Sequence, residues 1–226
     1  MGFIVAVDGT AGSGKGSVTK LVAEKLNLVT IDTGAMYRCV TLAMLEQKVG
    51  LEDIDKISNI LENVKIEFEE NPEHESGKKV ILNGNDVTDK IRSKEVNENV
   101  SPVSTIKIVR EHLAEMQREM AKSIDVMMEG RDIGTNVFPN ADVKIYLDAT
   151  PEERAERRFR QNKQNGIDIP FEEILKNVKE RDYIDSHREI APLTQAPDAV
   201  YIDSTGMSIE EEAEAVIKVI EEKRKA

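Results

Sequence analysis

The sequence contains no tryptophan, one cysteine and three histidines among its 226 residues. The single cysteine, Cys39, cannot form a disulfide within the chain. Such sparing use of cysteine is typical of proteins in a reducing compartment, so we expect a cytoplasmic location. The histidines are far apart in sequence, and none has a second ligand at the spacing of metal sites. A structural metal is therefore not expected.

Long apolar runs are also absent. None approaches the ~18 residues that a membrane-spanning helix needs. The first apolar run has no basic residues before it, which argues against a signal peptide. The net charge of −12 predicts a surface that repels nucleic acids and acidic lipids. We therefore expect neither a nucleic-acid nor a membrane partner, and the length fits one large or two small domains.

The stretch FIVAVDGTAGSGKGS, residues 3–17, is the most informative part of the sequence. Its first five residues are apolar and predict a strand buried on both faces of a parallel sheet. The spacing G-x-x-x-x-G-K follows from Gly9 to Lys15, and the next segment has a helical period. Strand, glycine loop and helix in this order are typical of a phosphate-binding P-loop. Backbone N–H groups and the helix dipole would hold a polyphosphate, and Lys15 would add its charge.

The hydroxyl that usually follows the P-loop lysine is missing, because Gly16 stands there. Ser17, one residue later, is therefore predicted to lie on the Mg²⁺ side of the nucleotide. An ordinary glycine-rich turn between a strand and a helix is the alternative interpretation. The residues predicted to bind the donor nucleotide in this loop are Gly9, Thr10, Ala11, Gly12, Ser13, Gly14, Lys15, Gly16 and Ser17.

Short apolar runs alternate with helical patterns along the rest of the chain, which predicts an α/β fold of the P-loop NTPase type. We expect a five-stranded parallel sheet with helices on both faces. Between residues 64 and 92 the pattern changes to a small antiparallel insert, with Asn83-Gly84 as a hairpin turn. The five strands are predicted at residues 3–7, 28–31, 124–128, 143–147 and 199–202. The main helices are predicted at 35 onward, 51–63, 93–100 (ending before Pro102), 106–122, 151 to about 166, 171–187 and 209 onward.

Arginines recur after predicted strands or on helices predicted to border a cleft, although the net charge is −12. Two phosphorylated molecules that meet in a cleft repel each other strongly. Planar guanidinium groups can bind their oxygens in pairs and neutralise them. The pattern predicts phosphoryl transfer, which depends mainly on positioning and charge neutralisation. These arginines are Arg38, Arg110, Arg131, Arg154, Arg157, Arg158, Arg181 and Arg188.

Four motifs, GTAGSGKGS, IDTGAMYR, EGRDIGT and KERDYIDSHR, occur in this order, with the antiparallel insert between the second and third. With them the chain resembles the bacterial cytidylate kinase family over nearly its whole length. The resemblance implies transfer of a phosphoryl group from Mg²⁺-bound ATP to CMP or dCMP, in pyrimidine nucleotide metabolism. Separately, we expect a monomer. It also implies a single nucleoside-monophosphate kinase domain over residues 1–226, with a core at 1–63 and 102–226, an acceptor-binding insert at 64–101 and a helical lid at 150–170.

The resemblance implies a role for each matching residue. Those implied to hold the phosphate of CMP are Arg38 and Arg131, and those implied to hold its sugar end are Arg181 and Asp185. Thr33, in the DTG turn, is also predicted to bind CMP. Those implied to surround its cytosine are Ser101, Arg110, Asp132 and Arg188. Those implied to contact ATP from the lid are Arg154, Arg157 and Arg158. Those implied to take part in catalysis are Lys15, Arg131, Arg157 and Arg181.

The chemistry of cytosine fits this assignment. Asp132 and Ser101 can accept a hydrogen bond from its amino group, whereas the arginines can donate to N3 and O2. Uracil reverses the donor and acceptor pattern at positions 3 and 4, so we expect a strong preference for CMP over UMP.

Two other functions stay open at this point. A P-loop kinase for a sugar acid, a shikimate-like acid or a coenzyme precursor would share the loop but would need neither the Arg38 and Arg131 pair nor the insert. A GTP-dependent switch would need an N-K-x-D motif, and the nearest match, at residues 162–165, lacks the acid. The acid that orients Mg²⁺ is also left open among Asp125, Glu129 and Asp132.

Overall fold

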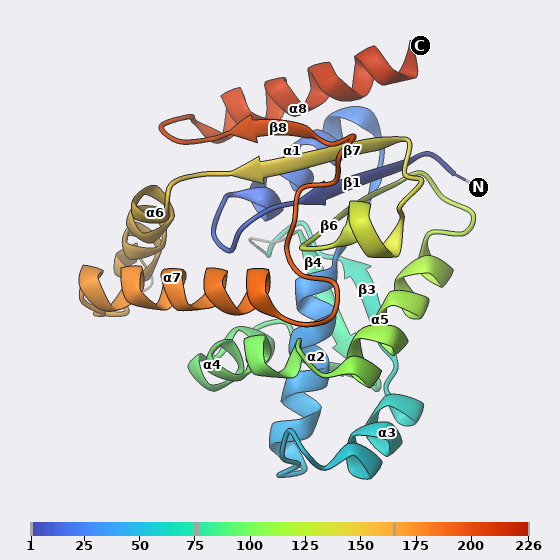
Figure 1. The fold of residues 1–226 in the computed structure, drawn as a ribbon, viewed down its shortest axis with the longest axis vertical. Coiled ribbons are helices and arrows are strands. Elements are labelled where there is room, and N and C mark those ends of the chain that lie inside the picture. Colours follow the sequence, from blue (N-terminus) through green and yellow to red (C-terminus); the bar gives the residue numbers. More distant parts are fainter. Residues whose placement is uncertain (1, 75–76, 165, 226) are drawn as a thin grey trace. The chain divides into compact units, whose positions relative to one another are not determined.

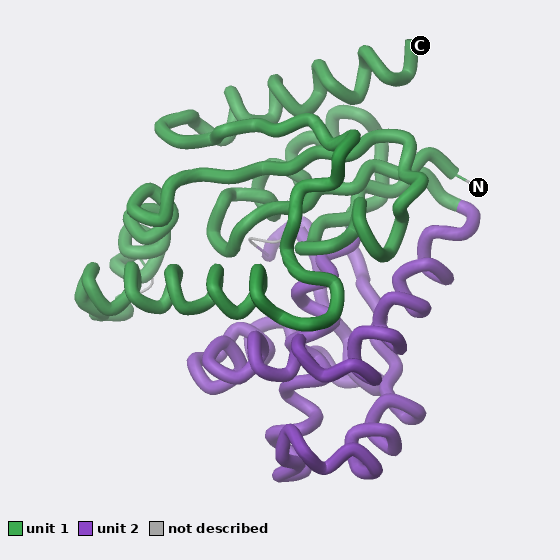
Figure 2. Tube along the Cα trace, viewed as in Figure 1, with its two compact units in different colours: residues 1–30, 124–226 green, residues 31–123 purple. Residues whose placement is uncertain are grey.

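The computed structural model describes residues 2–74, 77–164 and 166–225 (Figure 1). The chain divides into two compact units, residues 1–30 with 124–226 and residues 31–123 (Figure 2). The predicted insert, residues 64–101, lies within the second unit, which also contains residues 31–63 and 102–123 of the predicted core. The boundaries given for core, insert and lid stay predictions.

A five-stranded parallel sheet is confirmed, with the P-loop strand at its centre. Its strands, in spatial order, are β2 (Val29–Asp32), β6 (Val126–Gly130), β1 (Ile4–Asp8), β7 (Val143–Asp148) and β8 (Val200–Asp203). Since the strands are parallel, their carboxyl ends meet at one edge, which is where open α/β sheets bind ligands.

The two faces of the sheet in the first unit differ in what covers them. Val5 and Val7 point to one face and belong to a buried core with α1 (Lys15–Leu26) and α8 (Ile209–Arg224) (Figure 1). Each such buried side chain stabilises the fold by roughly 1.5–3 kcal/mol. The short π-helix η2 (Ile133–Val137) lies against the other face, where a Cβ built on Gly134 would approach Lys144 and Asp8.

Two consecutive helices of the first unit, α6 (Pro151–Gln164) and α7 (Phe171–His187), lie side by side (Figure 1). A small apolar cluster of Ala155, Ile174 and Val178 joins them. Thr150 caps the start of α6, because Glu153 N donates to Thr150 Oγ1. Residues 162–165 were compared above with the N-K-x-D motif, and the last of them, residue 165, lies outside the described residues.

The second unit contains the predicted antiparallel sheet. Asn83 and Gly84 both have positive φ (50° and 80°), as a tight hairpin turn between twisted strands requires. Its elements are α2 (Thr33–Glu46), α3 (Ile54–Asn63), β3 (Ile66–Glu70), β4 (Lys78–Leu82), β5 (Asn85–Asp86), η1 (Lys90–Arg92), α4 (Lys94–Val103) and α5 (Lys107–Met120).

Three predicted helix boundaries are wrong, one of them the start of α3, which begins at Ile54 rather than at residue 51. Helix α4 continues through Pro102 to Val103, because the proline removes one N–H only and Ser104 N still donates to Val100 O at 2.9 Å. Helix α2 begins at Thr33 rather than Ala35, because the Asp32 side chain accepts from Ala35 N and caps the first turn. In the described part of the chain, no helix combines the length and the apolarity of a membrane span.

Candidate active site

The P-loop, residues 9–15, connects β1 to α1 at the carboxyl edge of the sheet. Gly9 is required there, since a Cβ at this position would lie 1.8 Å from Leu147 O. Gly14 precedes α1 in the left-handed region (φ 91°), where other residues are strained. The Lys15 side chain curls back and donates from Nζ to Gly9 O at 2.9 Å and Thr10 O at 2.6 Å. The lysine of the predicted P-loop is therefore held against the loop backbone by its own hydrogen bonds.

Lys15 is buried and surrounded by charge. Burial, and then the nearby Arg131 guanidinium, lower the pKa of Lys15 to about 7, while the carboxylates of Glu129 and Asp8 act in the opposite direction. The phosphates of a nucleotide would add negative charge here, so the site favours an anion over a neutral ligand.

The loop after β6 brings two ion pairs to the same edge. Arg131 Nε donates to Asp185 Oδ2 at 2.9 Å, and its NH1 group donates to Gly130 O. Arg188 NH2 donates to Asp132 Oδ1 at 3.3 Å. Sequence reasoning assigned all four of these side chains to the acceptor, and the first unit brings them together.

Asp185 is the centre of this group and is only 4% exposed. Burial pushes the pKa of Asp185 upward, but three neighbouring guanidinium groups outweigh burial and hold the pKa below its ordinary value. Arg131 is the strongest of them, followed by Arg181 and Arg188. The carboxylate therefore stays ionised and fixes arginines that can also bind a phosphate.

The three acids left open for Mg²⁺ occupy different places. Asp125 lies at the amino end of β6, where its carboxylate accepts from Phe3 N. Asp132 already accepts from Arg188 and from Asn136 Nδ2. Glu129 borders the start of α1, because a Cβ built on Gly16 would lie 3.3 Å from Glu129 Oε1.

The three predicted lid arginines lie on α6 in different surroundings. Arg154 donates to Ala11 O of the P-loop and forms a bidentate ion pair with Asp182. Arg157 forms an ion pair with Glu212 at 2.9 Å and donates to backbone carbonyls, including Ser13 O at 3.4 Å and Ser204 O at 2.7 Å. Arg158 has no hydrogen-bond or ion-pair partner among the described residues, and burial lowers the pKa of Arg158.

The remaining predicted acceptor residues belong to the second unit. Arg38, on α2, is half-buried and donates from Nε to Asn97 Oδ1 of α4. Arg110, on α5, is 2% exposed, donates to Ser104 O and lies over the Tyr37 ring. Thr33 and Ser101 are both buried. Thr33 is the first residue of α2, and Ser101 lies near the end of α4.

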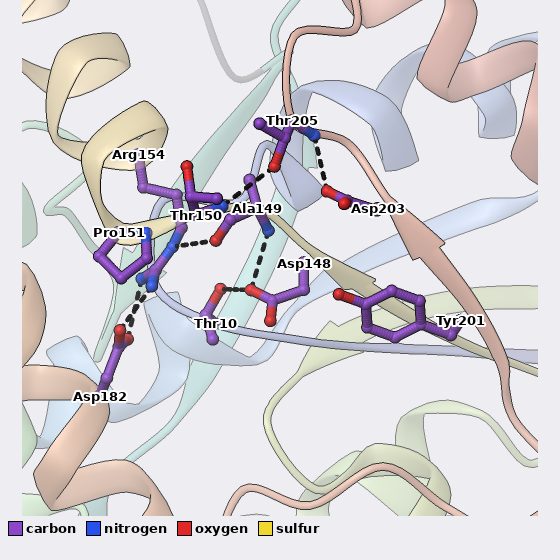
Figure 3. Close-up of a pocket in the computed structure, with 10 residues that line it drawn as sticks. All are labelled: Thr10, Asp148, Ala149, Thr150, Pro151, Arg154, Asp182, Tyr201, Asp203 and Thr205. Atoms are coloured by element: carbon purple, nitrogen blue, oxygen red, sulfur yellow. Dashed lines mark hydrogen bonds and ion pairs between the residues drawn. The ribbon is translucent and has the colours of Figure 1, made fainter.

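A cavity of about 290 Å³ borders the P-loop at the ends of β7 and β8 (Figure 3). Two of the residues that line it are joined by a hydrogen bond, in which Thr10 Oγ1 donates to Asp148 Oδ1 at 2.5 Å. The Arg154–Asp182 ion pair and the Tyr201 ring lie at its sides (Figure 3). Sequence reasoning assigned Thr10 and Arg154 to nucleotide binding but did not predict this hollow.

Three acids of the site were missed. Asp8 ends β1 and accepts from Ile133 N and Gly134 N, at 2.7 Å each, and burial raises the pKa of Asp8 to about 6. Asp182 and Glu212 are the partners of the α6 arginines. Asp8 could have been suspected from its place between a buried strand and the P-loop, whereas no local pattern singles out Glu212.

Comparison with known proteins agrees with these features. A model of the cytidylate kinase family matches residues 5–222. A cytidylate kinase from Fusobacterium nucleatum is 47% identical over 219 residues, which cover 97% of this chain and 97% of its own length. A cytidylate kinase from Ligilactobacillus salivarius is also 47% identical, covering 97% of this chain and 96% of its own.

Among solved structures, an uncharacterized protein from Eubacterium ventriosum has a TM-score of 0.52 at 11% identity, covering 97% of this chain and 98% of that one. At this identity the likeness concerns the fold alone. The family match and the curated relatives, in contrast, extend over nearly every residue described above. The chain belongs to the cytidylate kinase family.

Proposed function

We propose that this chain transfers the γ-phosphoryl group of Mg²⁺-bound ATP to the phosphate of CMP or dCMP, giving ADP and CDP or dCDP. Family membership makes the chain a nucleoside-monophosphate kinase. The observation that carries the proposal is the position of Arg131, which is close enough to the P-loop lysine to lower its pKa and is fixed by Asp185. We further propose that the enzyme acts as a cytoplasmic monomer on small-molecule substrates.

The donor side would consist of the P-loop and α6. Inward-facing N–H groups of the loop and the start of α1 would hold the β- and γ-phosphates, with Lys15 beside them. Arg158 is the α6 arginine whose charge no described residue compensates, so it is the one best suited to meet the charge that develops on the γ-phosphate.

The residues beside α1 fit a hard cation. The Ser17 hydroxyl is exposed in the first turn of α1, and the Glu129 carboxylate borders the same turn. Oxygen ligands of this kind suit Mg²⁺, which retains several waters and binds phosphates through its remaining positions. Bound there, the ion would neutralise charge on the β- and γ-phosphates.

The residues proposed for the acceptor are those that the family resemblance implies. Arg131 and Arg38 would hold the phosphate of CMP, and Arg181 and Asp185 its sugar. Asp132 would accept a hydrogen bond from the cytosine amino group while Arg188 keeps the carboxylate in place. Ser101 and Arg110 are also proposed to contact the base, as the family resemblance implies.

Turnover of CMP, dCMP, UMP, AMP and GMP with Mg²⁺-ATP tests the function. We expect kcat/KM for CMP to exceed that for UMP by at least about 10²-fold, because the carboxylate of Asp132 would face the O4 oxygen of uracil. An ADP-release assay measures all five acceptors under one condition. Equal rates for CMP and UMP would show that Asp132 does not read the amino group, and turnover of a sugar acid instead of CMP would contradict the function itself.

Replacing Glu129 with glutamine tests the Mg²⁺ site. We expect a loss of about 10–100-fold in activity at limiting Mg²⁺, partly recovered at high Mg²⁺, because removing a charged group beside a metal weakens its binding by this order. The measurement is kcat as a function of Mg²⁺ concentration.

Asp125→Asn is the matched control, because Asp125 lies at the opposite end of the same strand. Its Mg²⁺ dependence should equal that of the unchanged protein. A Glu129→Gln variant with an unaltered Mg²⁺ curve would remove Glu129 from the metal site.

A further inference from the structure

Arg154 is buried and almost fully occupied by protein acceptors. It is 2% exposed. Its Nε group donates to Ala149 O at 2.9 Å, and NH1 donates to Ala11 O at 3.0 Å. NH1 and NH2 also donate to the two carboxylate oxygens of Asp182, at 2.9 and 2.5 Å (Figure 3). These four bonds use most of the five N–H groups of a guanidinium.

The contact with Ala11 supports the P-loop from its outer side. A loop that turns its N–H groups inward around phosphates leaves carbonyl oxygens pointing outward, and buried carbonyls need a donor. Arg154 supplies this donor to Ala11 O. The position of the loop backbone at Ala11 therefore depends on where Arg154 is held.

Asp182 holds Arg154 and connects it to the acceptor side. Asp182 and Asp185 are three residues apart on α7 and so lie on the same side of that helix. Asp182 binds the arginine that supports the P-loop, and Asp185 binds Arg131. One turn of α7 thus carries the partners of both arginines.

We infer that Arg154 and Asp182 position the P-loop relative to α7, so that Arg154 acts on phosphoryl transfer through Ala11 and not by touching the donor nucleotide. This inference rests on the proposed function, since α7 is assigned to the acceptor through Arg181 and Asp185. Arg154 is a positioning residue, in contrast to the direct contact with ATP that the family resemblance implies for the lid arginines.

Arg154→Lys, Asp182→Asn and the double variant test the inference. Lysine keeps the charge but cannot make four directed bonds, and asparagine keeps the shape of Asp182 without its charge. We expect each single variant to lower kcat on the order of 10- to 100-fold with little change in KM for either substrate, because misplaced reacting groups slow the chemical step. The double variant should be no slower than the slower single variant, because both remove the same support.

Glu152→Gln is the matched control. Glu152 and Lys179 also join α6 to α7, at 3.0 Å, but both side chains are more than half exposed and neither contacts the P-loop. The control should retain kcat within about twofold, as expected for an exposed ion pair. Thermal melting of all variants separates loss of fold from loss of rate.

Three results would overturn the inference. In the first, Arg154→Lys weakens ATP binding in calorimetry while Asp182→Asn leaves both binding and kcat unchanged, which would make Arg154 a direct ligand. In the second, the two losses multiply in the double variant. In the third, the variants melt earlier but keep kcat, which would make the pair purely structural. A failure of the proposed function looks different, because the unchanged protein would then not turn over CMP.

Discussion

Replacement of Lys15 by alanine should lower kcat by on the order of 10²–10³-fold and leave CMP affinity within about threefold of the unchanged protein. Removing one group that stabilises transition-state charge in a water-excluded site has an effect of this size. The Lys15 side chain is buried in the P-loop, where it would meet the β- and γ-phosphates of ATP. Steady-state turnover gives kcat, and calorimetry with CMP alone gives the acceptor affinity.

Lys25→Ala is the control for the loss of one lysine from α1. Lys25 is exposed in the last turn of the same helix, so its removal changes the net charge equally without reaching the loop. Its kcat should stay within about twofold. If Lys15→Ala also abolished CMP binding, the lysine would be required for the fold of the acceptor site, and the division into donor and acceptor sides would be wrong.

Replacement of Arg131 by alanine is expected to lower kcat/KM for CMP by on the order of 10²–10³-fold while ATP affinity changes only a few-fold. Two charge-assisted hydrogen bonds to a phosphate, at ~1.5–3 kcal/mol each, account for a loss of this size. Arg131 is partly buried, and Asp185 fixes its Nε group. Water would therefore not easily take the place of the missing guanidinium group in the alanine variant. Separate calorimetric titrations with CMP and with a non-hydrolysable ATP analogue distinguish the two affinities.

Two further variants sharpen this result. Arg131→Lys keeps the charge and loses the planar fork, so its kcat/KM should fall between those of alanine and arginine. Arg160→Ala removes an exposed arginine of α6, which forms an ion pair with Glu156, and should behave as the unchanged protein. Equal losses of ATP and CMP affinity in Arg131→Ala would place this arginine at the donor instead.

Structural features that are determined by residues close together in the sequence could be predicted. The buried strand before Gly9, the Asn83-Gly84 turn and the cap of α8 at Ser208 all follow from local patterns, and all are present. The continuation of α4 through Pro102 could not be predicted. A proline lacks one backbone N–H, and a helix tolerates this loss only at some positions, here one residue before its end.

The partners of the charged side chains were less predictable. Asp182 is 28 residues from Arg154, on a different helix, and the choice of this partner depends on how α6 packs on α7. The same holds for Asp8, which binds backbone N–H groups 125 and 126 residues away. Sequence motifs therefore gave a set of arginines as candidates. Only the packing of the helices separates Arg154 and Arg157, which are held by protein groups, from Arg158.

The outer support of the P-loop also has a consequence for biosynthesis. Ala11 O and Ser13 O receive their donors from residues 143 and 144 positions later, and the Ser204 hydroxyl, 191 positions later, also donates to Ser13 O. A ribosome thus completes the glycine-rich segment long before it produces the side chains that hold it. Contacts over such separations are slow to form, because a long stretch of polypeptide must first be closed into a loop. The emerging chain acquires its nucleotide-binding sequence first, and the donors that hold this segment only after residues 154, 157 and 204 have been made.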